Sequence, residues 1–115
     1  MNRLTLVFSL LTAVSVLSAD WSQWRGPNFN GFTAEKGLPA EWTKESATWT
    51  ANLPGPSAAS PIILGDKIYL TSYSGYGVED QDGSMKDLTF HVLCVDRKSG
   101  NILWEKKIKP SLPES

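Results

Sequence analysis

The chain has 115 residues, and its 11 Lys and Arg against 12 Asp and Glu give a formal net charge of −1. So balanced a charge excludes the electrostatic footprint of a protein that binds nucleic acid or an anionic membrane surface. The one cysteine, Cys94, cannot form an internal disulfide.

The first residues have the layout of a secretory signal peptide. A short positive region, 1–3, precedes an apolar stretch over 4–17 and the small residues Ser18 and Ala19. As a helix, 4–17 would reach only ~21 Å, which is shorter than the ~30 Å hydrocarbon core of a bilayer. We predict a signal peptide over 1–19, cleaved after Ser18 or Ala19, and no stable membrane anchor. An uncleaved anchor is the alternative. The mature protein would then be exported, to the periplasm or the extracellular medium.

Residues 20–47 lack hydrophobic periodicity and are rich in turn residues such as Gly26, Pro27 and Gly31. Disorder is one interpretation, but disordered segments are usually poor in aromatic residues and this one is rich in them. We predict an irregular, ordered extension pinned by its aromatic side chains, which are Trp21, Trp24, Phe29, Phe32 and Trp42.

Residues 48–53 and 103–108 are predicted to be related strands. Each carries a Trp, an apolar residue four positions later, and then a proline break. That spacing puts both apolar side chains on one face of a sheet. Trp49 and Trp104 lie about 55 residues apart, and removing the loop over 73–86 would bring the interval to roughly 40, the period of a four-stranded propeller blade.

The clearest pattern lies between these two segments. Apolar runs over 60–64 and 67–72 are separated by the Gly-Asp step at 65–66, which is typical of a tight hairpin turn. Two further strands are expected over 88–96 and 101–104. The fold class is therefore all-β, with a four-stranded antiparallel unit. Such a unit cannot bury its own faces, so it implies neighbouring units.

The residues that mark the repeat are Trp49, Ser60, Pro61, Gly65, Tyr69, Asp96, Gly100 and Trp104. Together they resemble the pyrroloquinoline-quinone-type (PQQ-like) β-propeller repeat, with Cys94 at the position of a small Ala. The segment 20–28, D-W-S-Q-W-R-G-P-N, resembles the opening of exported bacterial PQQ-like propeller proteins, with Ser22 at the usual Pro. The resemblance implies that 48–115 contain a closing strand, which would complete the last blade, and a first blade. The sequence then stops where the second blade would begin.

The resemblance does not bring a quinone with it. PQQ-dependent alcohol dehydrogenases, as a family, hold the quinone with calcium, an Asp base, a Trp platform and a vicinal disulfide. This chain has no Cys-Cys pair and no carboxylate that matches that Asp. Trp49 and Trp104 match the packing Trp of the repeat, which docks between blades. We expect no bound PQQ and no other cofactor.

Metal binding is weighed at the acidic loop over 79–84. Alternate carboxylates could present oxygen ligands to calcium, but Gly83 falls too early for an EF-hand loop and the bidentate Glu is absent. A solvated acidic turn is the favoured interpretation, and no metal site is predicted. His91 is the only histidine and has no recognisable nucleophile partner, so we expect it at an edge or partly exposed strand position. Cys94 is expected to be a small buried apolar residue.

Function is predicted from what remains. No catalytic motif is present, and no catalytic residue is predicted. Tyr73 and Tyr76 lie in a long insertion, and long loops on rigid scaffolds often carry binding. A partner-contact loop and an idle insertion are both open. The resemblance implies a non-catalytic binding or assembly scaffold in the cell envelope, with a protein or polymer partner. The alternative is a quinoprotein-like oxidoreductase whose cofactor and catalytic residues lie beyond residue 115.

Overall fold

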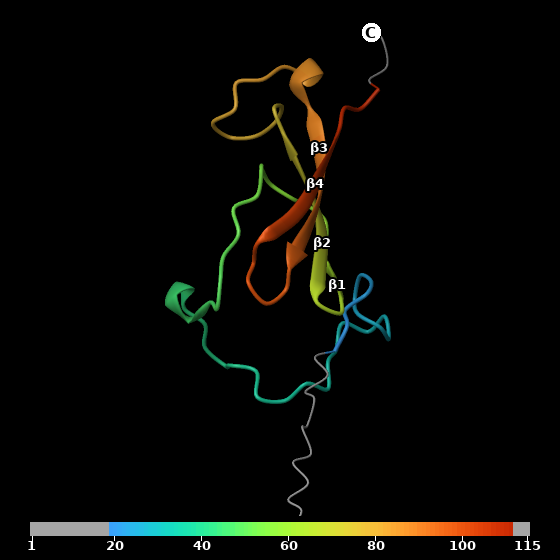
Figure 1. Ribbon diagram of the computed structural model, residues 1–115, viewed down its shortest axis with the longest axis vertical. Coiled ribbons are helices and arrows are strands. Elements are labelled where there is room, and N and C mark those ends of the chain that lie inside the picture. Colours follow the sequence, from blue (N-terminus) through green and yellow to red (C-terminus); the bar gives the residue numbers. More distant parts are fainter. Residues whose placement is uncertain (1–18, 112–115) are drawn as a thin grey trace, which may run out of the picture.

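The structure is a computed structural model that describes residues 19–111, so the predicted signal peptide lies outside the described residues except for Ala19. The described chain forms one antiparallel sheet of four strands in the order β1-β2-β3-β4 (Figure 1). The elements are η1 (Lys44–Ser46), β1 (Ile62–Leu64), β2 (Lys67–Ser74), η2 (Met85–Asp87), β3 (Thr89–Asp96) and β4 (Ile102–Ile108), where η denotes a short 3-10 helix. The predicted all-β class and the four-stranded antiparallel unit are confirmed.

Strands β2 and β3 form the centre of the sheet and pair along their whole length, from Lys67 opposite Asp96 to Ser74 opposite Thr89. β1 is much shorter and pairs only with the first part of β2. β4 pairs with β3 from Phe90 onward, and its register slips at a bulge between Cys94 and Val95. A β-bulge inserts one extra residue into one strand and increases the local twist.

The buried core is small and lies in the middle of β3. Leu93, Cys94 and Val95 are each at most 2% exposed, although successive residues of a strand point to opposite faces. Both faces of the sheet are therefore covered at this level. The prediction that Cys94 is a small buried residue is confirmed.

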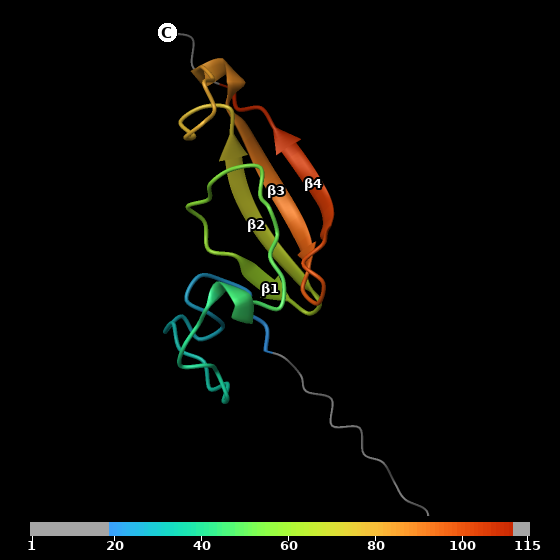
Figure 2. The same ribbon diagram turned by 90° about the vertical axis from the view of Figure 1, so that its left-hand side faces the viewer.

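The two faces differ in what covers them. The covered face carries Ile68, Leu70, Leu93 and Val95, and the segment 49–53 lies over it around a cavity of about 290 Å³. In Figure 2 this segment, drawn in green, crosses the sheet on its way to β1. The open face carries the alternate side chains of β2 and β3 together with three side chains of β4, namely Tyr69, Thr71, Tyr73, Phe90, Val92, Cys94, Trp104, Lys106 and Ile108.

The strand predicted over 48–53 does not form. The structure has no ladder pairing in this segment, which lies across a sheet face rather than along an edge. Strand geometry needs a hydrogen-bonded neighbour along an edge. Slightly later, the carbonyl of Pro56 accepts a hydrogen bond of 3.1 Å from the amide of Tyr73, which ties the segment to the outer edge of β2.

The extension over 20–47 contains turns, η1 and one isolated bridge. Both views place its first part beside β1 (Figures 1 and 2). Trp21 and Ile63 exchange backbone hydrogen bonds of 3.0 and 2.8 Å, and the Asp20 carboxylate accepts a bond from the Gly65 amide. Trp21 is half-buried and its ring lies against Gly26. The other aromatic side chains do not pin the extension as expected, because they are 67–72% exposed: Trp24, Phe29, Phe32 and Trp42.

Candidate interaction site

Trp49 joins two parts of the chain that lie 48 residues apart. Its indole Nε1–H donates a hydrogen bond of 3.0 Å to the carbonyl oxygen of Arg97, in the turn between β3 and β4. Its ring lies so close to Gly100 that a Cβ there would sit 2.4 Å from the ring carbon Cε3. Gly100 has a φ of +75°, a conformation that also favours glycine. The residue at 100 must therefore be glycine for two independent reasons, turn geometry and the docked ring.

The turn that receives Trp49 is held by Asp96. The Asp96 carboxylate accepts hydrogen bonds from the Lys98 amide and from both the amide and the hydroxyl of Ser99. The bonds from Ser99 hold the pKa of Asp96 below its usual value of 3.8. The backbone closes the same turn, because the Gly100 amide donates to the carbonyl of Asp96. Asp96 and Gly100, both predicted as repeat residues, thus shape one docking surface.

Trp104, the second Trp of the predicted repeat, is more exposed than Trp49. Its indole is 46% exposed on the open face. It meets Tyr69 across β3, with ring centroids 6.1 Å apart and planes tilted by 50°. Tyr69 and Trp104 are both register partners of Cys94, so the two rings close over this small side chain. A larger residue at 94 would push the rings apart, which is the physical reason for a small side chain at that position.

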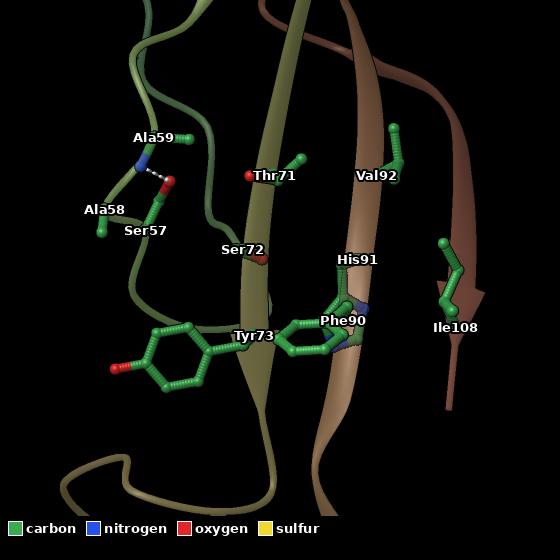
Figure 3. A pocket seen from close by; sticks show the side chains of 10 residues that line it. All are labelled: Ser57, Ala58, Ala59, Thr71, Ser72, Tyr73, Phe90, His91, Val92 and Ile108. Carbon is green, nitrogen blue, oxygen red and sulfur yellow. Dashed lines mark hydrogen bonds between the residues drawn. The ribbon is translucent and has the colours of Figure 1, made fainter. Parts of the chain in front are cut away.

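The open face is hollowed beside these rings. A pocket of about 540 Å³ lies between the segment 57–59 and strands β2 to β4. Figure 3 shows the rings of Tyr73 and Phe90 side by side at one end, with Thr71 and Val92 along the strands. Phe90 and Ile108 are 44% and 42% exposed. The exposed apolar side chains of β3 and β4 are thus continuous with the Tyr69–Trp104 pair.

The remaining repeat residues lie around the β1–β2 hairpin. Gly65 occupies the turn with a φ of +56°, as the predicted tight turn requires. Ser60 and Pro61 are exposed just before β1, and Pro61 borders the smaller cavity on the covered face. These residues lie where the chain enters the sheet and do not form a chemical site.

The structure separates the two tyrosines that were considered together. Tyr73 belongs to β2, is half-buried, and lines the open-face pocket. Tyr76 is 41% exposed and lies outside the lining of that pocket, in the loop that follows. This loop is tightly folded, since the Gly75 amide donates to the side-chain oxygen of Gln81 over 2.6 Å. The two side chains therefore belong to different surfaces.

His91 is placed differently from the prediction. It is 3% exposed and not at an edge, because β3 is a central strand with β2 on one side and β4 on the other. Its register places it on the covered face. Its Nε2 lies 2.7 Å from the Ser74 hydroxyl and its Nδ1 lies 2.6 Å from Oε1 of Glu105. Ser74 and Glu105 come from β2 and β4, one diagonal step either side of His91. The sequence did not predict this hydrogen-bonded arrangement, because the three residues come together only through strand register.

Metal chemistry receives no support from side-chain geometry in the described part of the chain. Within residues 19–111, no group of three or more His, Cys, Asp and Glu side chains could hold a metal ion. Among the same residues, no helix is both long and apolar enough to span a bilayer.

Comparisons with known proteins give no relatives. No protein-family model, no curated protein and no solved structure matches this chain.

Proposed function

We propose that this chain contributes a blade to an exported PQQ-like β-propeller that serves as a binding or assembly scaffold in the cell envelope. The observation that carries the proposal is the contrast between Trp49 and Trp104. They occupy the same place in the repeat pattern, each followed by an apolar residue four positions on. Trp49 is docked on the Asp96–Gly100 turn, whereas Trp104 presents its indole to solvent.

This contrast supports packing between successive blades. A second turn like the one around Gly100 would give the Trp104 indole the kind of docking surface and hydrogen-bond acceptor that Trp49 has. The open face offers the apolar surface that such packing buries, from Tyr69 and Trp104 to Phe90 and Ile108. Burying a Trp removes on the order of 150–250 Å² of surface from water, so covering this face has a strong hydrophobic driving force.

The meander order of the sheet supports the same proposal. Each strand pairs with the next along the chain, as in a four-stranded propeller blade. Strand β4 is exposed along its whole length and forms an edge of the described sheet. Edges of this kind are protected when blades close into a ring.

We favour a binding role for the propeller over a quinoprotein activity, because the residues that mark the repeat stabilise turns and side-chain packing. Gly100, Asp96 and Cys94 shape the turn and the contact between rings, and the open face is mostly apolar. The exposed aromatic residues of the extension add further surface for a protein or polymer partner. In soluble proteins, large exposed apolar patches commonly mark interaction sites.

The test is site-specific photo-crosslinking in the source cells, with benzoylphenylalanine at position 104 or, as a control, at Leu38. Leu38 is 57% exposed and belongs to the extension rather than to the sheet. We expect position 104 to cross-link to a segment of the same protein that carries an Asp-x-x-Ser/Thr-Gly turn, and mass spectrometry would identify that segment. The blade proposal would be contradicted if position 104 cross-linked only to other proteins, with the same yield as position 38.

A quinone titration separates the scaffold from the oxidoreductase. We expect no saturable quenching of tryptophan fluorescence when PQQ and calcium are added to the protein. Saturable binding together with reduction of an artificial electron acceptor would overturn the scaffold proposal and support a quinoprotein.

A further inference from the structure

Ser74, His91 and Glu105 form a hydrogen-bonded row that is separate from the apolar open face. The three side chains lie in one diagonal row across β2, β3 and β4. Both ring nitrogens of the buried His91 are engaged, by a hydroxyl on one side and a carboxylate on the other. Buried polar side chains normally have hydrogen-bond partners, so the hydrogen bonds alone indicate no function. The order hydroxyl, imidazole, carboxylate is more specific.

For a neutral imidazole, the Glu105 carboxylate sets the direction of both hydrogen bonds. An ionised carboxylate can only accept, so with a neutral imidazole the Nδ1 of His91 carries the proton and donates it to Glu105. Nε2 is then the free acceptor, and the Ser74 hydroxyl must donate to it over 2.7 Å. This is the arrangement in which a histidine acts as general base toward a serine, while an acid holds its tautomer and orientation.

The position of Ser74 suits a nucleophile. It is the last residue of β2 and is half-buried, whereas His91 behind it is buried. The chain leaves the sheet directly after it, at Gly75 with a φ of +87°. Gly75 is clamped, because a Cβ there would lie 2.2 Å from the carbonyl oxygen of Asp87 and its amide is bonded to Gln81. Ser74 therefore stands at a fixed point where a rigid strand meets the surface.

We infer that Ser74 is an activated nucleophile for acyl esters, with His91 as its general base and Glu105 as the residue that positions the imidazole. The Ser74 oxygen attacks the ester carbonyl carbon while its proton passes to Nε2 of His91. The carbon–oxygen bond to the alcohol then breaks, and the alcohol leaves with the proton from His91. Water hydrolyses the resulting acyl-serine along the same path, returning the proton to Ser74. This activity goes beyond the proposed scaffold role and does not depend on it.

The experiment is labelling of the full chain with a fluorophosphonate, followed by peptide mapping. The serine oxygen displaces fluoride from phosphorus, and His91 takes the serine proton, so the adduct reports the same activation without a leaving alcohol. We expect a single adduct on Ser74 in the wild-type protein. The wild-type map needs no variant and decides the proposal even if a substitution disturbs folding. No adduct on Ser74 overturns it.

Ser72→Ala is the matched control. Ser72 lies on the same strand and the same face, is 4% exposed, and its hydroxyl has no hydrogen-bond partner within the described residues. We expect Ser72→Ala to label at the wild-type rate and Ser74→Ala to show no adduct. His91→Gln removes the base and should slow labelling at Ser74 by at least about tenfold, since general-base catalysis is typically worth about 10²-fold or more.

Glu105→Gln tests the positioning role. We expect it to slow labelling less than His91→Gln does, and hydrolysis of p-nitrophenyl acetate should follow the same order across the variants. If the hydrogen-bonded chain is only structural, the variants will lower thermal stability while labelling of Ser74 stays no faster than that of other serines. That result, or labelling unaffected by His91→Gln, contradicts the inference.

Discussion

At the scale of single residues, the contact between Gly100 and Trp49 combines a positive φ with a ring packed against the glycine. Gly100→Ala would carry two costs, a left-handed backbone for a non-glycine residue and a Cβ 2.4 Å from the indole ring. Gly65→Ala carries only the first, since Gly65 has a φ of +56° and open space around its position. The pair therefore separates backbone strain from ring contact.

We expect Gly65→Ala to lower the free energy of unfolding by about 1–2 kcal/mol, the usual cost of a left-handed residue. Gly100→Ala should lower it by roughly a further 1–3 kcal/mol, the usual cost of overpacking. Urea unfolding followed by tryptophan fluorescence measures both values. Equal losses for the two variants would show that Trp49 is not docked on Gly100 in solution.

Asp96 links the same turn to pH. Its folded pKa is lowered from 3.8 by hydrogen bonds from Ser99, so its ionised form stabilises the fold. This contribution is fully present above pH 3.8 and is lost as the pH falls through the lower, folded pKa. We expect Asp96→Asn to lower the Tm at pH 6 and to reduce the fall in Tm between pH 6 and pH 3. An unchanged fall in Tm would show that Asp96 does not contribute to acid unfolding. Asp87, whose pKa the Ser84 bonds also lower, accounts for part of the fall that remains.

At the scale of elements, the end of β2 and the loop after it divide the two tyrosines. Tyr73 pairs with Phe90 in the sheet and lies beside it in the open-face pocket (Figure 3). Tyr76 is 41% exposed and lies in the loop after β2. We expect Tyr76→Ala to leave the Tm unchanged within error, and Tyr73→Ala to lower the free energy of unfolding by about 1–3 kcal/mol from lost packing. Thermal and urea unfolding of the two variants measure this difference. Equal destabilisation would mean that the loop packs on the sheet more closely than the structure shows.

The elements also show where strand prediction from sequence succeeds. The Gly-Asp step at 65–66 and the apolar runs on either side of it located the β1–β2 hairpin, because tight turns and short apolar runs are local properties. The segment 48–53 also has apolar residues at a strand-like spacing but forms no strand. A strand exists only with a hydrogen-bonded partner, and pairing is decided by residues far away in the sequence.

At the scale of the whole molecule, the extension and the sheet differ in how firmly they are held. The extension is tied to β1 at Trp21 and Asp20, while its later aromatic side chains are largely exposed, such as Trp42 at 72% and Phe32 at 67%. The sheet holds the buried core at Leu93 to Val95. Local stability follows buried contacts and protected hydrogen bonds.

We expect brief treatment with chymotrypsin to cut first after Phe32 or Trp42 and to leave the fragment from β1 through β4 intact. Mass spectrometry of the products over time measures the order of cleavage. Trp104 is 46% exposed but belongs to a paired strand, so it serves as the internal control for exposure without backbone freedom. Early cleavage after Trp104 would show that β4 is not stably paired.

The sequence by itself determined the all-β class, the four-stranded meander, the turn at Gly65 and the small side chain at Cys94, since each rests on spacing within a few residues. Only the tertiary structure decided which tryptophan is docked and that His91 is buried between Ser74 and Glu105. The physical reason is register. Residues far apart in the chain become neighbours through strand pairing and through a segment folded back over a sheet face, and no local pattern encodes those distances.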